Sequence, residues 1–302
     1  MNPFNSFISA LPGACAQGLI WGLMALGVYI SFRILNTSDL TVDGSIATGG
    51  AACLMLIRAG VPAAAAVAAS AAAGMIAGLV TGLLCTKCRI PAILSGILTQ
   101  LALYSVNLRI MAGKANQPVS VDKFRLLLSQ RYVRAAGFDN PIVLLALLSA
   151  VIIAAAYYFF GTEIGCSIRA TGNNRVMASA QGVNTDRCVV MGLMLANGLV
   201  AFSGALLAQY QGFADVNMGR GAIVIGLAAV IIGEVIFGKA FSFNFALRML
   251  AVVLGAVIYY VVLQLVLTLG LNTNDLKLIT SVIVAVFLTV PHLKGGRGNA
   301  RA

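Results

Sequence analysis

The chain has 302 residues, of which 60% are hydrophobic and 10% charged, and its mean hydropathy is +0.96. A soluble domain carries about 25% charged residues, so this composition excludes an ordinary soluble protein and predicts an integral membrane protein. The net charge of +11 does not indicate nucleic-acid binding, because the basic residues are spread over short loops and form no stripe with interleaved aromatic residues. Their placement suits anchoring beside anionic lipid.

Nine apolar runs bounded by charge or proline predict an all-α, polytopic membrane protein with about nine transmembrane helices in one domain, residues 1–302. The runs comprise residues 12–32, 44–58, 61–86, 90–112, 141–160, 188–211, 222–237, 248–270 and 276–291. The second and the seventh run are shorter than the roughly 20 residues that a full crossing needs, and both are rich in glycine. Such segments are expected where a helix breaks inside a cavity lined by protein.

Two short sequence matches predict that the helices form inverted repeats. Residues 39–44 read D-L-T-V-D-G and residues 215–219 read D-V-N-M-G, and each stretch follows a long run and precedes a short, glycine-rich one. An odd number of predicted crossings separates the two stretches, so they face opposite sides of the membrane. Inverted repeats in transporters have this pattern, with broken helices that meet near the middle of the bilayer.

Glycines spaced four residues apart predict close packing between helices. Gly74, Gly78 and Gly82 form one such ridge, and Gly18 and Gly22 repeat the spacing. Small residues let helix backbones approach each other in lipid, where no hydrophobic effect drives helices together. Packing within one chain is favoured over a dedicated dimer face.

Polar side chains near the two short runs are candidates for a translocation pathway. A charged side chain at the centre of a membrane helix costs about 2.5–3.5 kcal/mol, so acids in membranes usually face a cavity or a partner. One interpretation is therefore a polar pathway or gate for a zwitterionic solute. The residues assigned to it are Asp39, Thr41, Asp43, Asn197, Gln209 and Glu234.

A structural role is the alternative for the three acids in this set. Glu234 then marks the cytoplasmic end of its helix and pairs with Lys239 or Arg248. Asp39 and Asp43 then cap the start of the second predicted span.

The sequence predicts no enzymatic activity, cofactor or metal site on this chain. Residues 233–239 read G-E-V-I-F-G-K, but Ala240 follows where a phosphate-binding loop needs Ser or Thr to ligate magnesium, and the motif ends a membrane run. The only histidine, His292, has no neighbouring nucleophile or base. Cys85 and Cys88 form an isolated C-x-x-C without further ligands.

The polar stretch 161–187 contains T-E-I-G-C-S-I-R-A-T-G-N-N-R-V-M-A-S-A-Q-G-V-N-T. This run resembles the cytoplasmic coupling loop of ABC importer permeases in the branched-chain amino acid and ribose uptake family. Further runs closely resemble permeases of the tryptophan/tyrosine-type importers, and the similarity covers the chain from about residue 15 to residue 291. These runs are residues 33–45, 87–98, 191–239 and 269–278.

The resemblance implies that residues 161–187 form a cytoplasmic loop whose short helix docks on a separate ATPase subunit. ATP and magnesium are then bound by that ATPase. Two arginines in the loop offer charge-assisted hydrogen bonds, a glycine permits a turn, and small apolar residues form a face. The residues expected to couple to the ATPase are Arg169, Gly172, Asn173, Asn174, Arg175, Met177 and Ala178.

The resemblance also implies the orientation and the partners, because the charges on the two sides are too even to decide the orientation. A homodimer in the bacterial cytoplasmic membrane is expected, with cytoplasmic ABC ATPase subunits and an extracytoplasmic substrate-binding lipoprotein. Residues 113–140 then form an extracytoplasmic loop, and residues 292–302 form a basic cytoplasmic tail. The basic residues expected to dock the binding protein are Lys123, Arg125, Arg131 and Arg134.

The function predicted on this basis is that of the transmembrane permease subunit of an ATP-driven importer. It works by alternating access and carries aromatic amino acids, tryptophan or tyrosine, or a related small solute. The alternative is an ion-coupled secondary transporter of a small polar solute, which inverted repeats and membrane acids would also suit. A second alternative, an intramembrane enzyme or structural scaffold, lacks support, because the sequence has no paired His, Cys or acid cluster on adjacent helical turns.

Overall fold

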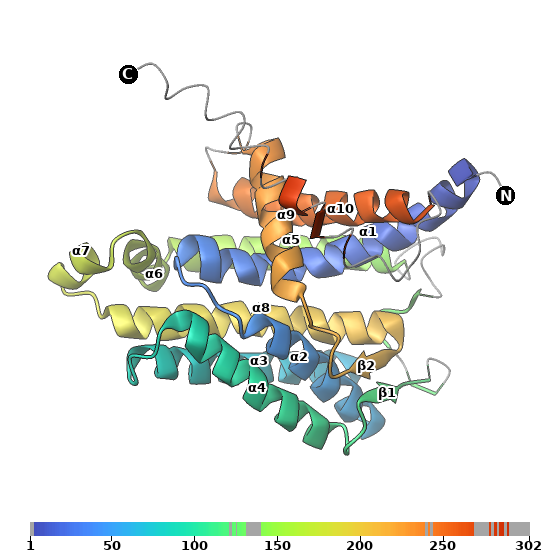
Figure 1. Cartoon of the computed structure of the whole chain (residues 1–302), viewed down its shortest axis with the longest axis horizontal. Helices are drawn as coiled ribbons and strands as arrows, with labels where there is room; N and C mark the ends of the chain where they lie inside the picture. Colours follow the sequence, from blue (N-terminus) through green and yellow to red (C-terminus); the bar gives the residue numbers. More distant parts are fainter. Residues whose placement is uncertain are drawn as a thin grey trace.

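The computed structural model describes residues 3–120, 123–124, 126–130, 140–238, 241 and 244–268, and towards the C-terminus residues 278, 281–282, 284–286 and 289. This part of the chain is almost entirely helical (Figure 1), and six of its helices are long and apolar enough to cross a membrane. The predicted all-α, polytopic membrane fold is therefore confirmed. The ninth predicted run, residues 276–291, lies mostly outside the described residues.

The elements follow the predicted runs closely. The first half contains α1 (Pro3–Val28), its π-helical continuation η1 (Tyr29–Ile34), α2 (Val42–Arg58), α3 (Ala63–Thr86), α4 (Ala92–Ile110) and the strand β1 (Asn116–Pro118). The second half contains α5 (Pro141–Gly161), α6 (Glu163–Asn173), α7 (Arg175–Ala180), α8 (Thr185–Gln211), the strand β2 (Phe213–Asp215), α9 (Ala222–Phe237) and α10 (Phe245–Thr268).

The centre of the bundle is the antiparallel pair α1 and α8, with α10 packed on α1 and α3 packed on α8 (Figure 1). Burial is greatest in the central pair. The most apolar 18-residue stretch is 72% buried in the span Phe7–Ile34, which comprises α1 and η1, and 67% buried in α8, but only 17% buried in α5. The outer faces of α4 and α5 carry exposed aliphatic side chains, among them Ile93 and Leu98 of α4 and Leu147 and Val151 of α5, which suits contact with lipid.

The glycine ridges make these close contacts possible. A β-carbon at Gly82 of α3 would lie 2.9 Å from Val190 Cα of α8, and one at Gly18 of α1 would lie 2.7 Å from Val257 Cα of α10. Such distances are too short for any larger residue. The predicted use of the ridges for packing within one chain is confirmed.

The two short helices α2 and α9 each follow a non-helical segment that enters the bundle. The segment before α2 comes from the end that carries α6 and α7, whereas the segment before α9 comes from the end that carries β1 and β2 (Figure 1). With 17 and 16 residues, the two helices are too short for a full crossing. Their opposite entry agrees with the predicted inverted repeat.

A small two-stranded sheet closes the end of the bundle opposite α6 and α7. β1 pairs antiparallel with β2, with Asn116 opposite Asp215. Arg58 at the end of α2 donates to the Gln117 side chain, and Gln117 Nε2 donates to the Met111 carbonyl oxygen at 2.9 Å. The sheet therefore holds the ends of α2, α4 and α8 together.

Candidate functional site

Two short helices, α6 and α7, fill the predicted coupling loop at the other end of the bundle (Figure 1). Each begins at a polar cap: Thr162 Oγ1 accepts from Gly165 N at 3.3 Å, and Asn174 Oδ1 accepts from Met177 N at 3.0 Å. Such caps satisfy backbone N–H groups that the helix itself leaves unpaired. Asn174, which the sequence assigned to the ATPase contact, thus has a structural role in starting α7.

Two of the predicted coupling residues face the transmembrane helices. A β-carbon at Gly172 would clash with the Ile34 carbonyl oxygen and lie 2.9 Å from Leu35 Cα, so the end of α6 rests directly on the end of η1. The Arg169 guanidinium lies 5.8 Å from the centre of the Phe245 ring at the start of α10. Because α6 contacts both η1 and α10, a displacement of this loop would move helices from the first and from the second half of the chain.

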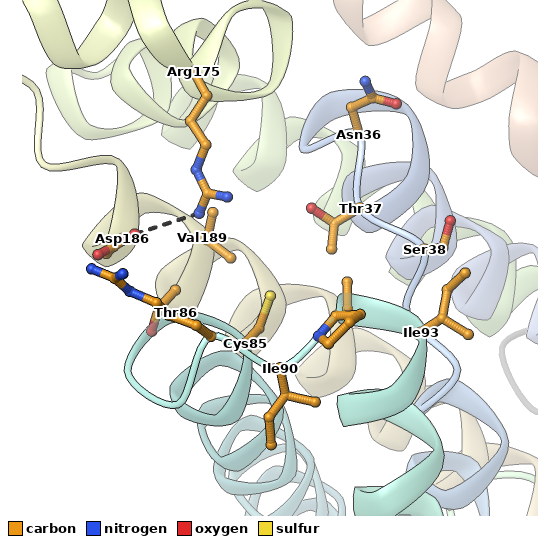
Figure 2. A pocket seen from close by; sticks show the side chains of 13 residues that line it. Asn36, Thr37, Ser38, Cys85, Thr86, Ile90, Ile93, Arg175, Asp186 and Val189 are labelled. Atoms are coloured by element: carbon orange, nitrogen blue, oxygen red, sulfur yellow. Dashed lines mark ion pairs between the residues drawn. The ribbon is translucent and has the colours of Figure 1, made fainter.

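Arg175 lines a cavity of about 740 Å³ between α7, the start of α8, the α3–α4 turn and the segment 36–38 (Figure 2). Arg175 Nη2 lies 3.5 Å from Asp186 Oδ1, and both side chains are about half exposed. Figure 2 shows Asn36 and Thr37 across the cavity from this ion pair. Exposed pairs of this kind contribute about 0–1 kcal/mol to stability, so Arg175 can exchange Asp186 for another partner at little cost.

The outer surface of α7 is more apolar than the sequence suggested. Ala178 is buried, Met177 is 58% exposed, and the neighbouring Val176 is 80% exposed. Val176 was not among the predicted coupling residues. Its position between Arg175 and Met177, in a helix that Asn174 caps, is the sequence feature that could have identified it. Val176, Met177 and the exposed Asn173 form a surface that can bind a partner, whereas Ala178, predicted to belong to it, is buried.

Asp39 and Asn197 are brought together at the break before α2. Asp39 is 2% exposed; Oδ1 accepts from Thr41 N at 2.9 Å, and Oδ2 accepts from Asn197 Nδ2 at 2.6 Å. Asn197 Oδ1 in turn accepts from Ser45 Oγ at 2.6 Å. This buried network fixes the start of α2 against α8.

Thr41 begins a second polar contact that the sequence did not predict. Its hydroxyl lies 2.8 Å from Thr81 Oγ1, which donates to Thr99 Oγ1 at 2.9 Å. Three threonines, from α3, from α4 and from the segment before α2, therefore form one hydrogen-bonded chain around the break. Sequence spacing gives no sign of it, because the residues come from α3, α4 and the segment before α2.

Asp43 caps the other broken helix. Its carboxylate accepts from Gly221 N and Ile223 N, each at 3.0 Å, at the N-terminus of α9. The helix dipole adds to this attraction. The two breaks, which the sequence singled out as matching stretches, thus meet through one carboxylate.

Glu234 pairs with Arg33, with Oε1 at 2.8 Å from the Arg33 Nε atom. The sequence suggested Lys239 or Arg248 as partners of Glu234, and Lys239 lies outside the described residues. Glu234 and Arg248 both line a cavity of about 960 Å³. This cavity also includes Arg169 and Gly172, so Glu234 belongs to the α6–α7 end of the bundle.

The remaining predicted residues lie at the β1–β2 end. Gln209 is completely buried; its Oε1 accepts from Leu127 N at 2.9 Å and its Nε2 donates to Cys53 Sγ at 3.2 Å. It holds the segment after β1 against α8. Lys123 is exposed at the same end, while Arg125, Arg131, Arg134 and the tail 292–302 lie outside the described residues.

No group of three or more His, Cys, Asp or Glu side chains suited to a metal ion occurs in the described part of the chain. Taken together, the fold defines a multi-pass membrane protein whose two broken helices meet inside the bundle. This arrangement is typical of transporters.

Comparison with known proteins identifies the family. Residues 12–290 match the family described as branched-chain amino acid transport system / permease component. The chain is 37% identical over 286 residues to the tyrosine transport system permease protein of Clostridioides difficile (strain R20291), covering 95% of this chain and 92% of that protein. It is 35% identical over 286 residues to the uncharacterized protein RP368 of Rickettsia prowazekii (strain Madrid E), covering 94% of this chain and 97% of that protein. No solved structure gives a significant match.

The chain belongs to the family of branched-chain amino acid transport permeases, and it is a permease component of a transport system. The resemblance stated from the sequence is thereby confirmed.

Proposed function

We propose that this permease is the membrane-spanning subunit of an ATP-driven ABC importer for aromatic amino acids, tyrosine or tryptophan. It acts as a homodimer in the bacterial cytoplasmic membrane, with cytoplasmic ATPase subunits on α6 and α7 and an extracytoplasmic binding protein at the β1–β2 end. The observation that carries the proposal is the similarity, over nearly the whole chain, to a tyrosine transport system permease.

The contacts of α6 support a mechanical role for this end of the bundle. Gly172 packs against Ile34 and Leu35 without space for a β-carbon, and Leu35 precedes the break that Asp39 fixes. A ligand or partner shifts a conformational equilibrium only through its different affinities for the two states. A tight contact between α6 and η1 allows ATPase binding energy to act on the break before α2.

Uptake by the complete importer tests the proposal. The permease is reconstituted into liposomes with its cognate ATPase and binding protein, and uptake of radiolabelled L-tyrosine and L-tryptophan is measured with unlabelled leucine or ribose as competitors. We expect uptake that needs ATP, persists when proton and sodium gradients are collapsed, and resists both competitors.

Two controls separate the alternatives. An ATPase variant that cannot hydrolyse ATP should abolish uptake. Uptake by the permease alone, driven by an ion gradient and indifferent to ATP, would instead support a secondary transporter and contradict the proposal.

A further inference from the structure

A cavity of about 260 Å³ lies on the β1–β2 side of the point where the two broken helices meet. Its walls are the first turn of α2, one face of α4 and the segment 216–220 that leads from β2 to α9. The polar side chains in these walls are Asp43, Gln100, Tyr104, Asn107, Asn217 and Arg220. The function proposed above assigns no solute to this place.

Asn107 is the most informative residue of the cavity. It is 1% exposed, yet neither Nδ2 nor Oδ1 has a hydrogen-bond partner within the described part of the chain. A buried polar group without a partner costs about 1–3 kcal/mol, and native proteins contain few of them. An amide in the wall of a cavity, with a donor and an acceptor that the described residues leave unpaired, is suited to a polar ligand.

The cavity also carries one charge of each sign. The Asp43 carboxylate accepts two backbone hydrogen bonds from the start of α9 and lines the cavity beside them. Arg220, one residue before Gly221, is exposed and forms no ion pair with the described residues. A guanidinium binds a carboxylate well, and Asp43 offers an opposite charge to an ammonium group.

The α4 wall of the cavity also carries apolar surface. Tyr104 is 43% exposed and Leu101 is 64% exposed, one turn apart on the same helix. An aromatic ring can pack against both. Pockets for drug-sized ligands measure about 300–1,000 Å³, so this smaller volume suits a single amino acid and not an oligopeptide.

We propose that this cavity is a binding site for the α-amino acid in transit, on the side from which the binding protein delivers it. Arg220 and the Asn107 amide N–H bind the α-carboxylate, Asp43 and the Asn107 carbonyl oxygen bind the α-ammonium, and Tyr104 and Leu101 pack against the side chain. The inference rests on the proposed function, because the side of delivery follows from the assignment of α6 and α7 to the ATPase.

Equilibrium binding of radiolabelled L-tyrosine to the purified permease, without ATPase or binding protein, tests this site alone. We expect saturable binding that L-tryptophan competes for, whereas tyramine and 3-(4-hydroxyphenyl)propionate, which lack the carboxylate and the amine respectively, compete at least tenfold more weakly. Arg220→Gln and Asn107→Leu should each weaken binding at least tenfold, a change of about 1.4 kcal/mol. Arg109→Gln, on the same helix as Asn107 but outside the cavity, should change it by less than about twofold.

Thermal unfolding separates loss of the site from loss of the fold. Leucine has nearly the shape of asparagine and removes an unpaired buried amide, so Asn107→Leu should leave the melting temperature unchanged or raise it while binding is lost. L-tyrosine should raise the melting temperature of the wild type but not of either cavity variant.

The site is refuted if the wild type binds no L-tyrosine at millimolar concentration, or if a well-folded Asn107→Leu variant binds as the wild type does. Neither result bears on ATP dependence, which the uptake experiment decides. Loss of binding in both cavity variants but not in Arg109→Gln would support the site even if uptake proved independent of ATP.

Discussion

Asp39 is a carboxylate in the interior of a membrane protein, and its hydrogen bonds define what it does. Backbone N–H of Thr41 and the side-chain amide of Asn197 both donate to it, so it fixes the break before α2 to α8. Asn197 Nδ2 also donates to the Leu193 carbonyl oxygen, so we expect Asp39→Ala to leave the Thr41 N–H and one N–H of the Asn197 amide unpaired and to destabilise the fold by about 1–3 kcal/mol for each donor left buried.

The melting temperature of the purified protein measures this effect. Ser38→Ala is the matched control, since Ser38 is the exposed neighbour of Asp39. A melting temperature of Asp39→Ala equal to that of the control would contradict the structural role of Asp39.

Asp43 acts on a helix that is not its own. Because its carboxylate caps α9, Asp43→Ala should loosen the start of α9 at a cost of about 0.5–2 kcal/mol, whereas Asp43→Asn, which keeps one acceptor, should cost less. Hydrogen exchange followed by mass spectrometry should show faster exchange at residues 221–225 in the alanine variant. Faster exchange confined to the first turn of α2 would mean that Asp43 caps α2 instead.

The contact between α6 and η1 has no room for a larger residue at position 172. Gly172→Val would press α6 away from the Ile34 carbonyl oxygen. We expect the variant to insert into the membrane, yet to take up L-tyrosine at least tenfold more slowly in the reconstituted importer. Gly161→Val is the control, because no atom lies within 4 Å of a β-carbon built there; equal uptake by both variants would contradict a role for the contact.

The surface of α7 can be tested by substitution as well. Arg175→Glu combined with Asn173→Ala should abolish uptake while leaving the amount of protein in the membrane and its melting temperature unchanged. Asp186→Ala removes the same ion pair but keeps Arg175. This variant therefore shows the effect of losing the ion pair alone, without loss of a contact between Arg175 and the ATPase. Uptake at the wild-type rate in the double variant, or an equal loss in Asp186→Ala, would count against direct binding of the ATPase by Arg175.

The native cysteines can report the orientation of the whole molecule in the membrane. Cys88 and Cys166 are exposed, and both lie at the end that carries α6 and α7. We expect a membrane-impermeant maleimide to label them in inside-out vesicles and not in intact spheroplasts. Labelling of Cys88 or Cys166 from outside, identified by peptide mass spectrometry, would reverse the proposed orientation.

Much of this architecture could be predicted because each membrane helix corresponds to one continuous apolar run in the sequence. Apolar runs gave eight helices in the described part of the chain, and the two glycine-rich short runs became the broken helices α2 and α9. The match between residues 39–44 and 215–219 located the breaks, since both occur where a helix must start inside the bundle.

Pairings between distant residues could not be predicted in the same way. The partner of Glu234 is Arg33, from the other half of the chain, and the sequence suggested only nearby cations. Asn107 lies in an apolar run where nothing local distinguishes a buried, unpaired amide from an exposed one. The sheet of β1 and β2 joins strands of three residues each, too short to leave a periodic pattern.

Photo-crosslinking from α7 tests most directly the claim that an ATPase drives this permease. p-Benzoylphenylalanine is placed at Val176, which is 80% exposed on α7, and for comparison at Phe213, which is 38% exposed at the opposite end. After irradiation of native membranes, we predict a covalent adduct with an ABC ATPase subunit from position 176 and none from position 213. An ATPase adduct from position 213, or no ATPase adduct from position 176, would contradict the account.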